Sequence, residues 1–291
     1  MEQQKKDKSG KVSKKKWILY GITAVILVWL SWSNVTVQLS RITVSDADLP
    51  TAFEGYKIAQ ISDLHNAKFG KDNNVLIQML EEHQPDIIVI TGDMVDSNHT
   101  DVEVAIQFAR RAAAIAPCYY VTGNHEGWLE KEYERLEAGL LAVGVDVMHD
   151  EAVILEKGGD SMQLIGVDDP TFRYYFGGNP FRSQLQKLKN NDEFTVLLSH
   201  RPELFETYVK EDVDIVFTGH AHGGQVRIPF VGGVVAPGQG FLPEYDAGIY
   251  TEGTTTMVVS RGIGNSVVPV RVNNRPEIVI VELQKEETGN D

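Results

Sequence analysis

The pattern of apolar and polar positions separates one long apolar segment near the start of the chain from a longer stretch of mixed character. No residue between Trp17 and Ser40 is charged, and Trp17 to Trp32 is almost wholly apolar. A helix of about 20 residues crosses the hydrocarbon of a bilayer, and residues 33–37 bring the segment to that length. Trp and Tyr near both ends are typical of the membrane interface. We therefore expect a transmembrane anchor at 17–37.

Lysines directly before this segment set its expected orientation. Residues 1–16 carry seven Lys against Glu2 and Asp7, a net charge of +5. Positively charged flanks stay in the cytoplasm. We therefore expect a single-pass protein of the cell membrane. It would have a basic cytoplasmic tail at 1–16, one anchor in membrane lipid and an extracytoplasmic domain. The alternative is a signal peptide cleaved near Ser31 to Ser33, which gives a secreted protein.

Beyond the anchor, apolar runs and amphipathic stretches alternate. Their periods predict strands at 35–44, 56–62, 86–91 and 118–122 and helices at 71–84, 100–114 and 128–143, with Thr100 and Glu103 as a capping box. Later strands are predicted at 145–148, 152–156, 162–167, 194–199, 214–218 and 278–283, and helices at 180–189 and 202–209. Strand–helix units followed by consecutive strands indicate an α/β fold with mixed sheets. We expect one domain at 38–283 and a polar tail at 284–291.

Charge and cysteine content exclude several classes of protein. The chain of 291 residues has a net charge of −14, so removing the +5 of the basic tail leaves −19 on the rest. A domain this acidic is a poor general binder of nucleic acid, and we expect no nucleic-acid partner. A single cysteine excludes a disulfide scaffold and a four-cysteine zinc site. The sequence does not fix the oligomeric state.

Five predicted strands are each followed by residues that can bind a metal ion. The five blocks are Ile61-Ser-Asp63-Leu-His65, Thr91-Gly-Asp93, Thr122-Gly-Asn124-His125-Glu126, Leu198-Ser-His200 and Thr218-Gly-His220-Ala-His222. Each block alone is common in loops, but chance assembly of all five after strands is remote. Ligands gather at the carboxyl ends of strands in α/β sheets, so we expect the blocks to converge. The remaining histidines, His83, His99 and His149, are expected in solvent.

The donor types point to two metal ions. Asp, His and Asn without a thiolate suit Mn, Fe or Zn better than Ca. The candidate ligands are too many for one four-coordinate ion and suit two ions that share a carboxylate: Asp63, His65, Asp93, Asn124, His200, His220 and His222. Asp93 is the natural bridge, because it stands alone between the paired residues Asp63/His65 and His220/His222.

These blocks resemble the pattern of the calcineurin-like metallophosphoesterases, which is D-x-H, G-D, G-N-H-[ED], H and G-H-x-H. All five blocks are present from Asp63 to His222 without a substituted ligand position. The stretch from Gly219 to Gln225 is similar to that of bacterial membrane-associated members. The resemblance implies two mixed β-sheets packed as a sandwich and flanked by helices.

The resemblance also implies roles for the site residues. One metal ion is held by Asp63, His65, Asp93 and His222, and the other by Asp93, Asn124, His200 and His220. His125 matches a catalytic histidine that is not a ligand, and supplies a proton or a positive charge to the leaving oxygen. The implied reaction is hydrolysis of a phosphate mono- or diester by a hydroxide that bridges the two ions.

Three points stay open at this stage. The substrate is unresolved; some relatives hydrolyse a UDP-2,3-diacylglucosamine pyrophosphate, so a lipid-linked or nucleotide-sugar pyrophosphate is a candidate. The alternatives are an inward-facing hydrolase of that type and a non-catalytic metal-binding scaffold. Arg227 and Arg261 either contact substrate phosphate or form structural ion pairs, and the aromatic residues Phe172, Tyr174, Tyr175 and Phe176 are expected to pack in the core.

Overall fold

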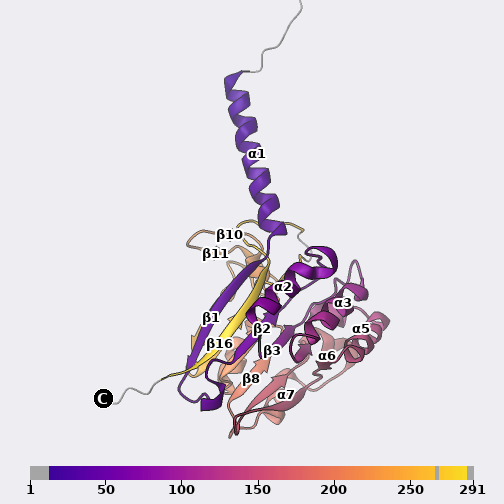
Figure 1. Cartoon of the computed structure of the whole chain (residues 1–291), viewed down its shortest axis with the longest axis vertical. Coiled ribbons are helices and arrows are strands. Elements are labelled where there is room, and N and C mark those ends of the chain that lie inside the picture. Colours follow the sequence, from indigo (N-terminus) through magenta and orange to yellow (C-terminus); the bar gives the residue numbers. More distant parts are fainter. Residues whose placement is uncertain (1–12, 266–268, 287–291) are drawn as a thin grey trace, which may run out of the picture.

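The computed structural model describes residues 13–265 and 269–286, whose strands include two packed six-stranded sheets (Figure 1). The first has the order β1 (Gln38–Asp46), β16 (Glu277–Lys285), β2 (Lys57–Ile61), β3 (Ile87–Thr91), β4 (Cys118–Val121), β5 (Val145–Val147). The second has the order β14 (Gly248–Glu252), β15 (Thr255–Val259), β9 (Ile215–Thr218), β8 (Thr195–Leu198), β7 (Asp160–Gly166), β6 (Glu151–Lys157). Both sheets combine parallel and antiparallel pairs, which confirms the predicted α/β fold with mixed sheets.

Alternation along the strands builds three apolar layers. In β3, Ile88 and Ile90 pack toward the helices that cover the first sheet, whereas Ile87 and Val89 pack between the two sheets. The layer between the sheets also contains Phe217 of β9. Successive strand residues point to opposite faces, so a strand buried on both faces must be apolar throughout.

Helices cover the outer face of each sheet. Helices α2 (Asn74–His83), α3 (Val102–Ala113) and α5 (Lys131–Ala142) contribute to the apolar layer on the first sheet. Helices α7 (Phe181–Leu188) and α8 (Phe205–Lys210) contribute to the layer on the second. The sandwich flanked by helices is therefore confirmed.

Some local predictions are wrong. The capping box of Thr100 and Glu103 does not form, because α3 begins after Asp101 and no side chain caps it. The helix predicted at 128–143 is α5, which begins only at Lys131, after Glu130 with a φ of 50°; the short helix α4 (Asn124–Gly127) precedes the predicted range. The first strand begins at Gln38, because the preceding helix runs to Val35.

The aromatic cluster lies on helix α6 (Pro170–Phe176), which the sequence pattern did not indicate. Phe172 is buried and stacks on Phe176 with ring centroids 4.4 Å apart. Tyr174, Tyr175 and Phe176 are 82%, 58% and 44% exposed, so the expectation that these three pack in the core is wrong.

Helix α1 (Lys14–Val35) projects from one end of the sandwich (Figure 1). In the described residues it is the one helix long and apolar enough to cross a membrane. Its 22 residues span about 33 Å at 1.5 Å per residue. Residues 1–12 of the predicted basic tail and 287–291 of the predicted polar tail lie outside the described residues, and β16 continues two residues into that tail, to Lys285.

Candidate metal centre

The predicted metal-binding blocks follow the carboxyl ends of strands from both sheets, and the two sheets meet at these ends. Strands β2, β3 and β4 are parallel neighbours in the first sheet, and β8 and β9 are parallel neighbours in the second. The side chain of Gln60 connects the sheets, since its Nε2 donates to Thr91 Oγ1 at 3.0 Å and to the Thr218 carbonyl at 2.8 Å. All seven predicted ligands are buried at this junction.

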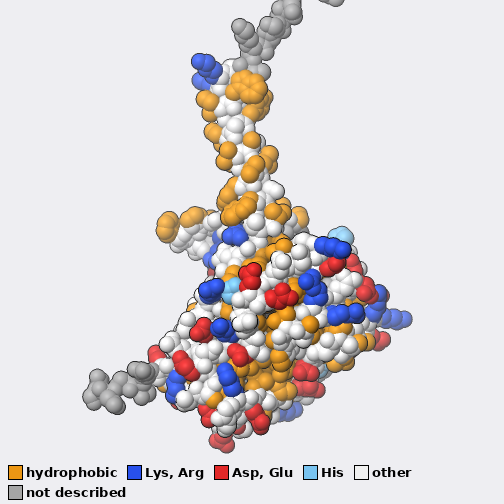
Figure 2. Space-filling view, in the orientation of Figure 1, with side chains coloured by type: hydrophobic (Ala, Val, Ile, Leu, Met, Phe, Trp, Pro, Cys, Tyr) orange, Lys and Arg blue, Asp and Glu red, His pale blue; other side chains and the backbone are white. Residues whose placement is uncertain are grey.

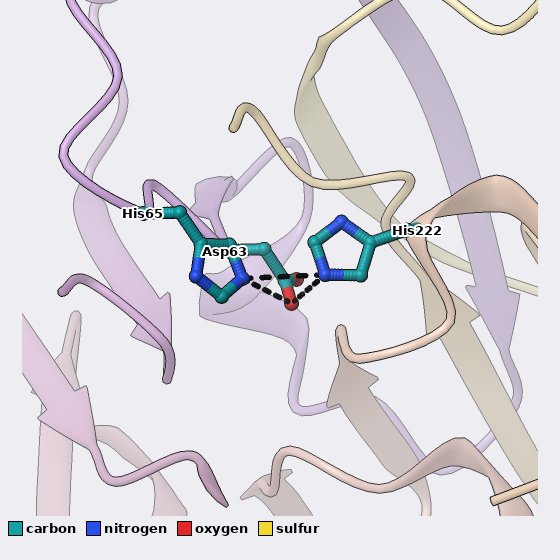
Figure 3. Close-up of side chains that lie close together, drawn as sticks. All are labelled: Asp63, His65 and His222. Atoms are coloured by element: carbon teal, nitrogen blue, oxygen red, sulfur yellow. Dashed lines mark hydrogen bonds and ion pairs between the residues drawn. The ribbon is translucent and has the colours of Figure 1, made fainter. Parts of the chain in front are cut away.

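Asp63, His65 and His222 form the first cluster (Figure 3). His222 Nε2 lies 3.3 Å from Asp63 Oδ1 and 3.2 Å from His65 Nε2. His65 Nε2 lies 3.9 Å from the same Asp63 oxygen. The three side chains therefore turn one oxygen and two ring nitrogens toward a common point.

Asp93, Asn124, His200 and His220 form the second cluster. His200 Nε2 lies 3.2 Å from each of Asp93 Oδ2, Asn124 Oδ1 and His220 Nδ1. The Nδ1–H of His200 donates to the Thr91 carbonyl at 2.7 Å, which leaves Nε2 facing the cluster.

Asp93 lies between the two clusters. Its Oδ2, 3.2 Å from His200 Nε2, is also 3.6 Å from His65 Nε2. Its Oδ1 accepts a hydrogen bond from the His125 backbone N–H at 2.8 Å. One carboxylate oxygen therefore faces both clusters, which is the geometry required of a ligand shared by two ions.

The backbone around the site is held in an uncommon conformation. The φ angles of five predicted ligands are positive: Asp63 51°, His65 43°, Asp93 52°, His220 63° and His222 48°. Positive φ is rare for residues other than glycine and clusters at functional sites. Gly219 allows the loops to approach, because a Cβ there would lie 1.9 Å from Ser62 Oγ.

Burial and charge together set the protonation of the site. Burial opposes ionisation of Asp63 and Asp93, yet the neighbouring His222 and His200, respectively, hold their pKa values well below the usual range. Burial lowers the pKa of His222 to about 3, so its ring is neutral. Burial also lowers the pKa of His200, but the negative charge of Asp93 outweighs burial and raises that pKa to about 10. The site thus presents two carboxylate anions for cations to bind.

His125 lies beside the clusters and is not one of their ligands in the predicted set. Its Nδ1 accepts a hydrogen bond from the Ser97 backbone N–H at 3.0 Å. Its ring packs on His65, with centroids 4.5 Å apart. A buried carboxylate, Asp96, lies beside it, with a carboxylate oxygen within 4.8 Å of ring nitrogens of His65 and His125.

Three residues that support the site were not predicted, the buried Glu126 and Arg271 and the half-buried Arg201. Glu126 accepts from the backbone N–H groups of Asp93, Met94 and Gly123 at 2.7–2.8 Å, and burial raises its pKa to about 7. Arg201 donates to His220 Nε2 at 2.8 Å and pairs with Asp169. Arg271 places a guanidinium nitrogen 3.3 Å from His222 Nδ1. Only Glu126 had a sequence signal, as the last letter of the G-N-H-[ED] block.

The clusters open into a cavity of about 710 Å³. Its lining combines Asp93, Asn124, His125, His220 and His222 with Ser97, Asn98, Trp128, Thr171, Arg201, Pro237 and Gly238. A cavity of this size holds a phosphate group together with an organic substituent.

The residues present fit two first-row metal ions. The donors are nitrogen and oxygen only. In each of the groups Asp63/His65/His222 and Asp93/His200/His220, the ligand atoms lie within 4.8 Å of one another. Ring nitrogens of two histidines stand 3.2 Å apart in each cluster, where a shared cation would occupy the point on which their lone pairs converge.

Other predicted candidates have structural partners. Arg227 pairs with Asp246 at 3.0 Å, and Arg261 with Glu277 at 3.8 Å. His149 is not in solvent as expected: it is half-buried, with Nδ1 2.9 Å from Asp168. His99 has the predicted exposure, with 90% of its side chain accessible.

Comparison with known proteins gives the family. Residues 56–224 match the calcineurin-like phosphoesterase family. The Bacillus subtilis metallophosphoesterase YkuE is 28% identical over 85% of this chain and 86% of its own length, and the Escherichia coli phosphodiesterase YaeI is 27% identical over 78% and 82%. A Bos taurus transmembrane protein with a metallophosphoesterase domain is 27% identical over 96% of this chain, which spans 64% of the bovine protein.

The chain belongs to the calcineurin-like phosphoesterase family, whose members are metal-dependent phosphoester hydrolases. The predicted enzyme class is therefore confirmed. The fold and the donor-rich junction between the sheets agree with that class.

Replacing Glu126 tests whether it positions Asp93. In Glu126→Gln an amide donor faces a backbone N–H, so the free energy of unfolding should fall by roughly 1–3 kcal/mol. Affinity for the ions should fall about 10- to 100-fold, as for other residues that orient ligands. Metal titration followed by mass spectrometry, with denaturant unfolding in detergent, measures both.

The matched control is Glu134→Gln on the exposed side of α5, which should change stability by less than about 0.5 kcal/mol. Wild-type metal affinity in Glu126→Gln would contradict a positioning role for the buried carboxylate.

Proposed function

We propose that this protein is a membrane-anchored phosphoesterase that uses two metal ions to hydrolyse phosphate mono- or diesters. The observation that carries the proposal is the position of Asp93 Oδ2, which faces His65 and His200 at once. The proposed ligands of one ion are Asp63, His65, Asp93 and His222. Those of the other are Asp93, Asn124, His200 and His220.

When bound, two ions of Mn, Fe or Zn would polarise the phosphoryl group and lower the pKa of the attacking water. The protein's own contribution is to hold the donors in place before substrate arrives. Arg201 fixes His220 from behind, and Asn274 Nδ2 donates to the His222 carbonyl at 2.7 Å. The substrate enters the cavity with its phosphate toward Asp93 and its organic group along Trp128.

His125 is the proposed catalytic residue that is not a ligand. A backbone N–H can only donate, so the bond from Ser97 makes Nδ1 the acceptor and places the proton of the neutral ring on Nε2. Burial lowers the pKa of His125, which favours that neutral ring. We infer that Nε2–H donates a hydrogen bond to the leaving oxygen as negative charge develops there.

The cavity volume favours a substrate larger than inorganic phosphate or a simple methyl ester. A lipid-linked or nucleotide-sugar pyrophosphate fits this class. Anchoring is supported by α1 and by the name of the bovine relative.

The central test is Asp93→Asn in the full chain, solubilised in detergent and supplied with Mn²⁺. Losing the shared carboxylate removes several kcal/mol of electrostatic stabilisation, so kcat/KM for an aryl phosphodiester should fall about 10³-fold or more. The control is His99→Asn, an exposed histidine outside the clusters, which should keep wild-type activity. If wild type with Mn²⁺ hydrolyses the diester no faster than Asp93→Asn, the proposed enzyme activity fails and the metal-binding scaffold is supported.

The role of His125 is tested by varying the leaving group. His125→Ala should lower kcat about 10²- to 10⁴-fold for a diester with an alkyl leaving group, which needs a donor at its oxygen. The loss should be much smaller for a nitrophenyl leaving group, whose anion is stable without one. Equal losses for both diesters would show that His125 acts on some other step.

The proposed topology places residues 1–16 in the cytoplasm and the domain at 38–283 outside the membrane. Because the native cysteine, Cys118, is buried, single new cysteines report accessibility. In intact spheroplasts a membrane-impermeant maleimide should label Glu134→Cys on α5 and should label Ser9→Cys only after lysis. The reverse pattern supports the inward-facing hydrolase, and loss of the first residues from the mature chain supports a secreted product.

A further inference from the structure

The segment from Val226 to Leu242 is apolar and almost uncharged in an otherwise acidic protein. It carries one charge, Arg227, which pairs with Asp246. The segment forms two small hairpins, β10 (Arg227–Ile228) with β11 (Gly232–Gly233) and β12 (Val235–Ala236) with β13 (Gly240–Phe241).

Large apolar side chains face solvent at the turn of the first hairpin and at the open end of the second. Phe230 is fully exposed, and Phe241 is 83% exposed. Ile228, Val231 and Leu242 are 47%, 60% and 64% exposed. We call these five residues the apolar tips. Soluble surfaces rarely gather so many exposed apolar side chains, and such groups mark an interaction site.

The apolar tips belong to the part of the domain that adjoins α1. Asn34, in the last turn of α1, exchanges two hydrogen bonds of 2.8 Å with the backbone of Arg271. The next residue, Val272, accepts from the Arg227 backbone N–H at 3.0 Å and forms a bridge with Val226. The adjacent residues Arg271 and Val272 therefore connect the end of α1 to the base of the first hairpin. Figure 1 shows β10 and β11 beside that end, and Figure 2 shows hydrophobic atoms at the tip of the projection there.

The junction between α1 and the domain leaves little slack. The Arg275 guanidinium lies 4.7 Å from the centre of the Trp32 ring and donates to the carbonyls of Thr36 and Val37. Strand β1 then begins at Gln38. With α1 spanning the bilayer, Trp32 lies at the interface, and this face of the domain stands directly against the lipid headgroups.

We propose that the apolar tips form a second membrane contact, inserted at the boundary between headgroups and acyl chains. The bilayer is favoured over a second copy of the chain because α1 already places that face of the domain at the bilayer surface. The near absence of charge in the segment removes the desolvation cost that acidic surfaces elsewhere on this domain would meet.

This contact has a consequence for the site. Pro237 and Gly238, from the same segment, line the cavity, and Arg271 contacts both the end of α1 and His222. Two attachments, rather than one, would fix the cavity beside the headgroups, where it takes phosphate esters carried by membrane lipids. That consequence rests on the proposed phosphoesterase activity, whereas the membrane contact rests only on the proposed anchoring by α1.

The contact is tested by a depth measurement that needs no turnover. The full chain carrying Phe230→Cys is labelled with the fluorophore NBD and reconstituted into vesicles of phosphatidylethanolamine and phosphatidylglycerol. We expect a blue-shifted emission that is quenched by lipids with a spin label on the acyl chain. The matched control is Ile154→Cys on the edge strand β6, another exposed apolar site, which should show neither effect.

Phe241→Cys provides a second position should labelling at 230 disturb the hairpin, and it should behave like Phe230→Cys. Emission at both positions equal to that at 154 would overturn the proposal. Disulfide crosslinking between copies through Phe230→Cys, persisting as the protein is diluted in lipid, would overturn it in favour of a second copy. Because no outcome depends on hydrolysis, failure of the membrane contact stays distinguishable from failure of the proposed enzyme activity.

Discussion

The site depends on holding the Asp93 carboxylate fixed at a buried point between two sheets. The backbone N–H groups of Asp93 and Gly123 donate to one carboxylate oxygen of Glu126, and the backbone N–H of Met94 donates to the other. The Oδ1 of Asp93 is in turn held by the His125 backbone. Burial and the charge of Asp93 together raise the pKa of Glu126 to about 7, and the hydrogen bonds from the Gly123 and Asp93 backbones oppose that rise. The donors of both clusters are placed relative to the Asp93 side chain.

The sandwich supplies the rigidity that such an arrangement requires. Left-handed backbone at Asp63, His65, Asp93, His220 and His222 costs about 1–3 kcal/mol at each residue and persists only where the surroundings impose it. The preceding strands are buried on both faces, and Gln60 ties the two sheets together directly beneath the loops. The apolar layers therefore stabilise the fold. Part of that stability offsets the strain of the loops, which direct their donor atoms toward the junction between the sheets.

The sequence indicated the fold and the donor blocks because both are local patterns. A buried strand and the residue that follows it are adjacent in the chain, and parallel strands bring such residues to one edge. Arg201 and Arg271 could not be found in this way, since Arg271 contacts His222 across 49 residues and its meaning lies only in that contact. The capping box prediction failed because α3 begins one residue later than the pattern indicated, so Asp101 and not Thr100 precedes its first turn. Tyr174 and Tyr175 were misjudged because apolar character alone does not say which side of a short helix is covered.

The junction of α1 with the domain determines where the chemistry takes place. A domain on a flexible tether samples many heights above a bilayer, but here the last turn of α1 is hydrogen-bonded to Arg271, and Arg275 holds the two residues that follow it. The Arg271 side chain also adjoins His222 and donates to the carbonyls of Arg261 and Gly264, so the loops of the candidate metal centre and the end of α1 contact one fully buried residue. Under the proposed anchoring, the distance from bilayer to cavity would therefore be set by the fold. Substrates whose phosphate lies at the membrane surface would then meet the site without leaving the bilayer, whereas a soluble ester would have to diffuse to it.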